Sequence, residues 1–215
     1  MIKKLLILVV CVAVVATLVP GYVGAASPSV GAGLAQEQEY IQAINKLERY
    51  LSISETGNIV LNAPKGIVKS IDSEVYQSLL AGLEQTNSMI DSGYLVANPD
   101  FTLTVTEKYS VEGIQALSSS GGIDAIYYYW WGFYLYLSDD TCDAIVFAMR
   151  SGAGAAGIAA AISAAFGALP GTIVAGIIAG ILTIGSSIIA YYDRNNTGVK
   201  IRWHWPIGPT GIWSQ

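Results

Sequence analysis

The first clear pattern of hydrophobic and polar positions lies between Gly31 and Ser52. Apolar side chains recur there every three or four residues, at Ile41, Ile44, Leu47 and Leu51, with charged and amide side chains between them. This spacing places the apolar residues on one stripe of a helix. A second stripe from about residue 72 to residue 91 predicts another helix, and residues 101–106 alternate apolar and polar side chains as a half-buried strand does.

The pattern changes after residue 122. Residues 125–137 are rich in Tyr and Trp, which favours a strand. Ser138, Asp139 and Asp140 are typical N-cap residues, so we expect a helix to begin near Asp139. The chain then runs from Ser151 to Tyr192, 42 positions, without Asp, Glu, Lys, Arg or His. Most small soluble domains carry fewer uncharged residues than this in one stretch.

The uncharged run predicts a hairpin of two antiparallel helices. Leu169-Pro170-Gly171 breaks it into residues 151–168 and residues 172–192. The second segment, as a helix, would be about 30 Å long, the thickness of the hydrocarbon core of a bilayer. Small residues four apart on both segments predict that the two helices pack through strips of Gly and Ala, with Gly176 and Gly180 opposite Ala156, Ala160 and Ala164.

The hairpin can be permanently buried, buried but able to enter a membrane, or always in a membrane. We expect a hairpin that is buried in the folded protein but able to enter a membrane. The residues expected to matter for insertion are Gly154, Ala160, Pro170, Gly171, Gly176, Gly180 and Ile181.

A last strand is predicted at residues 199–205, where apolar and basic side chains alternate. Because an antiparallel hairpin returns the chain to its starting side, this strand should pair antiparallel with the aromatic strand before the hairpin. Tyr and Trp favour the bilayer interface, and basic side chains favour lipid phosphates. The expected interface aromatics are Tyr128, Trp130, Trp131, Tyr134, Trp203 and Trp205. The expected phosphate contacts are Arg150, Arg194, Lys200 and Arg202.

Composition and charge divide the chain into parts. Residues 1–25 have the basic start, apolar centre and small-residue end of a secretory signal peptide, with an uncleaved anchor as the alternative. Residues 26–117 form an acidic pro-region or small α+β domain, and the Ser/Gly-rich residues 118–122 form a linker or a surface loop. Residues 123–215 form the hydrophobic hairpin domain with its aromatic strands. The expected fold class is α+β, with a helical N-terminal pro-region and a hydrophobic helical hairpin flanked by two aromatic strands.

Candidate chemistry is sparse. Removal of the signal peptide leaves Cys142 as the one cysteine. We interpret it as a buried helix residue, with a dimer-forming or reactive thiol as the alternative. We interpret His204, the one histidine, as an ordinary exposed strand residue. The alternative is a pH-sensitive contact with lipid or a partner. We find no nucleophile motif, paired carboxylates or phosphate loop, so we predict neither an enzyme nor a cofactor or metal site. The acidic first part, with eleven acidic and five basic residues from Ala26 to Gly121, argues against nucleic acid.

Three segments resemble secreted bacteriocin-like proteins of Gram-positive bacteria. They are WWGFYLYLS, the run GAGAAGIAAAISAAFGALPGTIVAGIIAGILTIG and the tail WPIGPTGIWSQ. The resemblance implies a secreted protein, either membrane-active or pore-forming, whose partners are the lipid membrane of a target cell and, in a pore, further copies of itself. It also implies that the acidic part is a pro-region, removed by a cut near residues 116–122. The alternative is a non-toxic surface protein whose aromatic sheet binds wall sugars.

Overall fold

The computed structural model describes residues 30–109, 121–167 and 169–215. The predicted signal peptide and most of the predicted linker lie outside these residues. The first part of the chain forms helices around a small two-stranded sheet, β1–β2. Its elements are α2 (Val30–Leu47), the 3-10 helix η1 (Glu48–Tyr50), β1 (Leu51–Ile53), β2 (Ile59–Leu61), α3 (Lys65–Val68) and α4 (Ser73–Asp91).

The two amphipathic helices predicted for this part are confirmed as α2 and α4. Leu47 and Tyr40 of α2 are buried, and so are Leu79 and Leu83 of α4. The side chain of Asp72 caps α4 by accepting the backbone N–H groups of Glu74 and Val75. Capping and an apolar stripe are local properties, which is why these helices were predictable.

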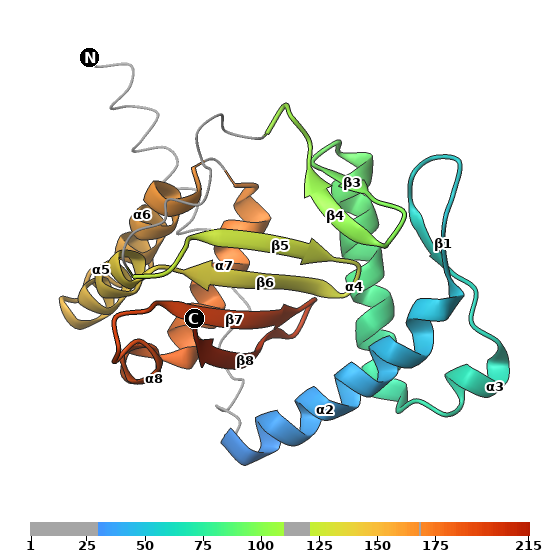
Figure 1. The fold of residues 1–215 in the computed structure, drawn as a ribbon, viewed down its shortest axis with the longest axis horizontal. Helices are drawn as coiled ribbons and strands as arrows, with labels where there is room; N and C mark the ends of the chain where they lie inside the picture. The colour runs from blue at the N-terminus through green and yellow to red at the C-terminus, as the bar shows by residue number, and fades with distance from the viewer. Residues whose placement is uncertain (1–29, 110–120, 168) are drawn as a thin grey trace.

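A six-stranded antiparallel sheet forms the centre of the molecule, and its strands are adjacent in chain order (Figure 1). The strands are β3 (Leu95–Ala97), β4 (Thr102–Val105), β5 (Ala125–Tyr129), β6 (Gly132–Leu137), β7 (Val199–His204) and β8 (Gly208–Ser214). The predicted antiparallel pairing around the hairpin is confirmed, because β6 pairs with β7 in a register that opposes Phe133 to Trp203. The single aromatic strand expected at residues 125–137 is instead a β-hairpin that turns at Trp130 and Trp131.

The chain between β6 and β7 forms four helices. They are α5 (Asp139–Arg150), α6 (Gly154–Phe166), α7 (Gly171–Ile184) and α8 (Ser186–Tyr192). The predicted start near Asp139 is confirmed, since the Ser138 side chain accepts the N–H of Thr141 as an N-cap. The predicted break at Pro170 is also confirmed, because Pro170 is the N-cap of α7.

The second hairpin helix is shorter than the sequence suggested. The sequence predicts one helix over residues 172–192, but α7 ends at Ile184 and α8 follows Gly185 at an angle of 85°. Gly185 has a positive φ of 84°, which glycine adopts without the steric penalty that other residues face. With 14 residues, α7 is about 21 Å long and does not reach the thickness of a bilayer core.

The predicted packing of the two hairpin helices through small residues is wrong. A Cβ added at Gly180 would overlap the indole of Trp203 on β7, and one at Gly176 would meet nothing within 4 Å. Ala156, Ala160 and Ala164 are exposed on the outer side of α6. The close helix contact lies elsewhere, since a Cβ at Gly157 of α6 would lie 2.6 Å from the Cβ of Ala148 on α5. Gly180 of α7 therefore serves contact with the sheet, and not with α6.

The sheet draws strands from both sides of the predicted linker. β4 pairs with β5, with Thr102 opposite Tyr129 and Leu103 opposite Tyr128. One continuous hydrophobic core runs from Tyr40 on α2 to Trp205 after β7. In the described residues, the acidic part and the hairpin part therefore share one sheet and one hydrophobic core.

Candidate functional site

The two faces of the central sheet have different surroundings. Alternate residues of β6 and β7, such as Leu135 and Ile201, are fully buried under α5–α8. The residues between them, such as Tyr136 and Lys200, point to the opposite face and are partly exposed. Figure 1 shows α7 behind the strands, with the opposite face of β5 and β6 toward the viewer. The molecule therefore has a helical side and an open sheet side.

The helical side has an outer surface without charge along α6 and α7. The exposed residues of α6 are small, including Ala155, Ala160 and Ser163. Those of α7 include Thr172, Ala175 and Leu182, and Leu182 is 45% exposed. A surface helix of a globular protein normally carries charged residues on its outer face. A two-helix surface without them is suited to contact with an apolar phase or a partner.

The helices that precede and follow α6 and α7 in the chain also carry exposed apolar side chains. Phe147 of α5 is 72% exposed and Tyr191 of α8 is 59% exposed. Ile188 of α8 is also exposed. The inner sides of the same helices are in the core, with Ile162, Ile177 and Ile181 fully buried.

The residues predicted to support insertion are spread over both sides of this layer. Ala160 and Gly171 are exposed, whereas Gly180 and Ile181 are buried against the sheet. The remaining three are half-buried: Gly154, Pro170 and Gly176. The structure places all seven in one two-helix layer, and only the outer ones are accessible in this fold.

Most of the predicted interface aromatics are in the core, which corrects their expected position. The five buried ones are Tyr128, Trp130, Trp131, Trp203 and Trp205, and Tyr134 alone of the six is half-exposed. Trp203 stacks on Phe133 with ring centroids 5.4 Å apart. The α7 helix covers this pair, since Gly180 lies against Trp203. Strand alternation alone does not reveal which face a helix will cover.

The predicted lipid-phosphate contacts do not form one cluster. Arg150 and Arg194 are exposed, but they lie near opposite ends of α5, because Asp193 adjoins Asp139 at the start of that helix. Lys200 and Arg202 lie on the open sheet face. Arg202 forms an ion pair with Glu37 of α2 and donates a 2.8 Å hydrogen bond to the hydroxyl of Tyr134.

A group of exposed and half-exposed aromatic residues lies on the open face, and of these the sequence pattern had indicated only Tyr134. We call this set the tyrosine face: Tyr127, Tyr129, Tyr134, Tyr136, Lys200 and Trp213. The ammonium nitrogen of Lys200 lies 4.2 Å from the ring centre of Tyr134 and 5.3 Å from that of Tyr136. The β-hairpin that brings Tyr127 opposite Tyr134 was not predicted, so neither was their grouping.

His204 is fully buried, which corrects its expected exposure. Tyr40 of α2 stacks on its ring at a centroid distance of 4.9 Å, and Trp131 lies at the same distance on another side. Its Nδ1 is 2.9 Å from the Thr210 hydroxyl, and its Nε2 has no hydrogen-bond partner among the residues that the structure describes. Burial, and to a smaller degree the charge of Arg202, lowers the pKa of His204 to about 3. The histidine is therefore neutral in the folded protein at pH 7.

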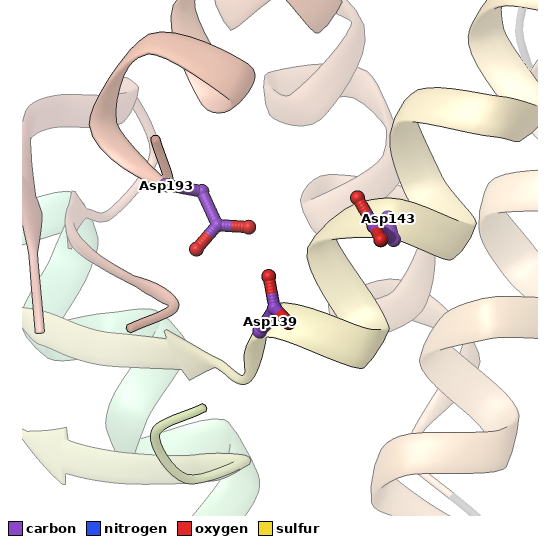
Figure 2. A group of neighbouring side chains, drawn as sticks. All are labelled: Asp139, Asp143 and Asp193. Atoms are coloured by element: carbon purple, nitrogen blue, oxygen red, sulfur yellow. The ribbon is translucent and has the colours of Figure 1, made fainter. Parts of the chain in front are cut away.

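Three carboxylates meet where α5 begins and α8 ends (Figure 2). Asp139, Asp143 and Asp193 each place an oxygen within 4.8 Å of the others. Asp193 is buried and accepts the N–H of Gly198, and burial together with the two neighbouring acids raises its pKa. Oxygen ligands of this kind suit a divalent cation, but Asp139 also lies in the first turn of α5, where a negative charge favours the helix dipole. The grouping alone therefore identifies no ion site.

Comparison with protein-family models, with curated proteins and with solved structures finds no match. Among the described helices, none is both long and apolar enough to cross a bilayer by itself. The helices α7 and α8 reach the required length and composition only when they are counted together across their bend.

Proposed function

We propose that this is a secreted membrane-active protein of the bacteriocin-like kind, which inserts the α6–α7 layer into a target membrane and forms pores there. The observation that carries this proposal is the uncharged outer surface of α6 and α7, between residues 151 and 192. In water this surface is tolerated because its exposed residues are mostly Ala, Gly, Ser and Thr. Transfer of this surface from water into a membrane requires little free energy, since no charge has to be removed from water.

The layer has a route from the folded state to a membrane. First, the exposed Phe147, Leu182, Ile188 and Tyr191 enter the interface region of the bilayer. The helices then exchange their contacts with the sheet for contacts with lipid, which preserves the burial of the isoleucines. Straightening at Gly185 joins α7 and α8 into one helix of about 33 Å, long enough to span the hydrocarbon core.

Dye release from liposomes tests this function, with the purified protein added to vesicles that carry an anionic lipid, between pH 4 and pH 7.5. The test variant is Ala175→Glu, which places a charge on the exposed side of α7 without disturbing the core. A charged residue at the centre of a membrane helix costs roughly 2.5–3.5 kcal/mol, so dye release should fall at least tenfold.

The matched control is Ala81→Glu, the same substitution at an exposed position of α4. It should leave dye release unchanged, and both variants should unfold at the wild-type temperature. Absence of dye release by the wild-type protein at every pH would overturn the proposal. Equal release by Ala175→Glu and wild type would show that α7 does not enter lipid.

A further inference from the structure

We propose that the tyrosine face binds a glycan whose sugar rings carry carboxylates. The inference concerns the open side of the sheet and does not depend on the membrane activity proposed for the helical side. It rests on the arrangement of the rings, on their rigidity and on the position of one ammonium group among them.

The residues of the tyrosine face are neighbours across four strands. Tyr127 on β5 lies opposite Tyr134 on β6, and Tyr136 on β6 lies opposite Lys200 on β7. Lys200 in turn lies opposite Trp213 on β8. Tyr127 is 49% exposed, and the other rings are half-exposed. Arg202 lies over the rings of Tyr134 and Trp213, and Tyr129 stacks on Trp131, so the most accessible ring is that of Tyr127. The C–H bonds of a sugar ring carry partial positive charge, so they pack well against the negatively polarised face of such a ring.

The rings are held in place before any ligand arrives. Tyr127 contacts Tyr136 edge to face at 5.4 Å, and Tyr129 contacts Tyr134 in the same way at 5.7 Å. The hydroxyl of Tyr134 accepts a hydrogen bond from Arg202, whose charge is balanced by Glu37. A preorganised surface loses little conformational entropy on binding, which favours affinity.

The charge on this face favours a carboxylate ligand. Within the part of the chain that the structure describes, Lys200 forms no ion pair, and the strand residues that share its face include no acid. Arg202 is already neutralised, so the face offers one uncompensated positive charge among several rings. That matches a chain of sugar rings with separate single charges better than a polyphosphate, whose closely spaced charges require several cations.

A groove beside the rings extends the surface. The ladder between β4 and β5 stops after two residue pairs, and beyond it the strands leave a groove of about 340 Å³. The groove lies between the two strands and is lined from both faces of the sheet, with Thr104 and Tyr127 on the open side. This volume is at the lower end for small-molecule sites, which suits a single sugar ring.

Isothermal titration calorimetry of the purified full chain tests the proposal with three probes. Oligogalacturonate supplies rings with carboxylates, its methyl ester supplies the same rings without charge, and inorganic polyphosphate supplies charge without rings. We expect oligogalacturonate to bind at least tenfold more tightly than the ester and than polyphosphate. Lys200→Gln should abolish the difference between oligogalacturonate and its ester, and Tyr127→Ala should weaken both at least fivefold.

The control is Tyr191→Ala, which removes an exposed tyrosine on α8, outside the tyrosine face, and should leave the affinities for oligogalacturonate and its ester at their wild-type values. Unchanged unfolding temperatures establish that the variants are folded. The proposal is overturned if oligogalacturonate does not bind, if Lys200→Gln still discriminates between the two oligomers, or if polyphosphate binds equally tightly. Binding that Tyr127→Ala leaves intact also overturns it.

Discussion

Gly180 of α7 lies against the indole of Trp203, and a Cβ at this glycine would occupy the space of the ring. The contact joins the helical layer to the sheet, and Pro209 lies close on the same side. One turn earlier, Gly176 meets nothing within 4 Å. The two glycines belong to the same pattern in the sequence but have different tertiary roles, and this difference yields a matched pair of variants.

Gly180→Ala should destabilise the protein, because the new methyl group must displace Trp203 or α7. Overpacking of this kind costs about 1–3 kcal/mol, which lowers the unfolding temperature of a chain of this size by roughly 2–12 °C. Gly176→Ala should instead stabilise by up to about 1 kcal/mol, since Ala favours a helix more than Gly does. Thermal unfolding followed by circular dichroism measures both. Similar shifts for the two variants would contradict the contact with Trp203.

Protonation of His204 at low pH should lower the free energy of unfolding of the protein. The pKa of this side chain is about 3 in the folded protein, against 6.5 for an ordinary histidine, so the unfolded chain takes up the proton first. The contribution of neutral His204 to the free energy of unfolding is therefore complete above pH 6.5. It declines as the pH falls below 6.5 and is lost near pH 3. This difference in pKa corresponds to roughly 4–5 kcal/mol. Urea unfolding at several pH values measures it.

His204→Phe tests that assignment, because the variant keeps a ring between Tyr40 and Trp131 but cannot titrate. The loss of stability between pH 7 and pH 4 should be smaller in the variant than in the wild type. Parallel pH curves for the two proteins would exclude His204 as the source of acid sensitivity.

The carboxylate cluster predicts a pH dependence of opposite sign. Burial and the neighbouring charges raise the pKa of Asp193 above its usual 3.8. Its contribution to stability is therefore greatest below pH 3.8 and is lost as the pH rises through the raised pKa. Asp193→Asn keeps an acceptor for the N–H of Gly198 and removes one charge. The variant should unfold at a higher temperature at pH 7 in buffer with EDTA, and this advantage should disappear near pH 3. An Asp193→Asn variant that unfolds at a lower temperature than the wild type at pH 7 would show that the carboxylate itself stabilises the fold.

A cut between residues 116 and 122 should leave two fragments that stay together. Mass spectrometry of the culture supernatant should show a fragment of roughly 90–100 residues that ends at Gln215, by the chain length between those points. The β4–β5 pairing, the contact of Tyr40 with His204 and the ion pair of Glu37 with Arg202 join the two parts. Gel filtration should therefore give one peak until denaturant is added. Separation without denaturant would show that these contacts do not hold the acidic part in place.

Local features of the sequence determined several elements of this protein. The apolar stripes of α2 and α4, the cap at Ser138 and the break at Pro170 act within one turn of the chain, so residue spacing reveals them. The alternation of Val199, Ile201 and Trp203 likewise determined that β7 has one buried face. The uncharged run showed that the hairpin would be apolar throughout.

Tertiary contacts decided what each surface faces. Trp203 is in the core because α7 covers that side of the sheet, and His204 is buried because Tyr40 of α2 lies on it. Tyr127 and Lys200 belong to one surface because three antiparallel pairings bring β5, β6, β7 and β8 side by side. These contacts join residues far apart in the chain. Periodicity assigns a side chain to a face, but the free energy of packing between distant elements decides which face becomes the interior.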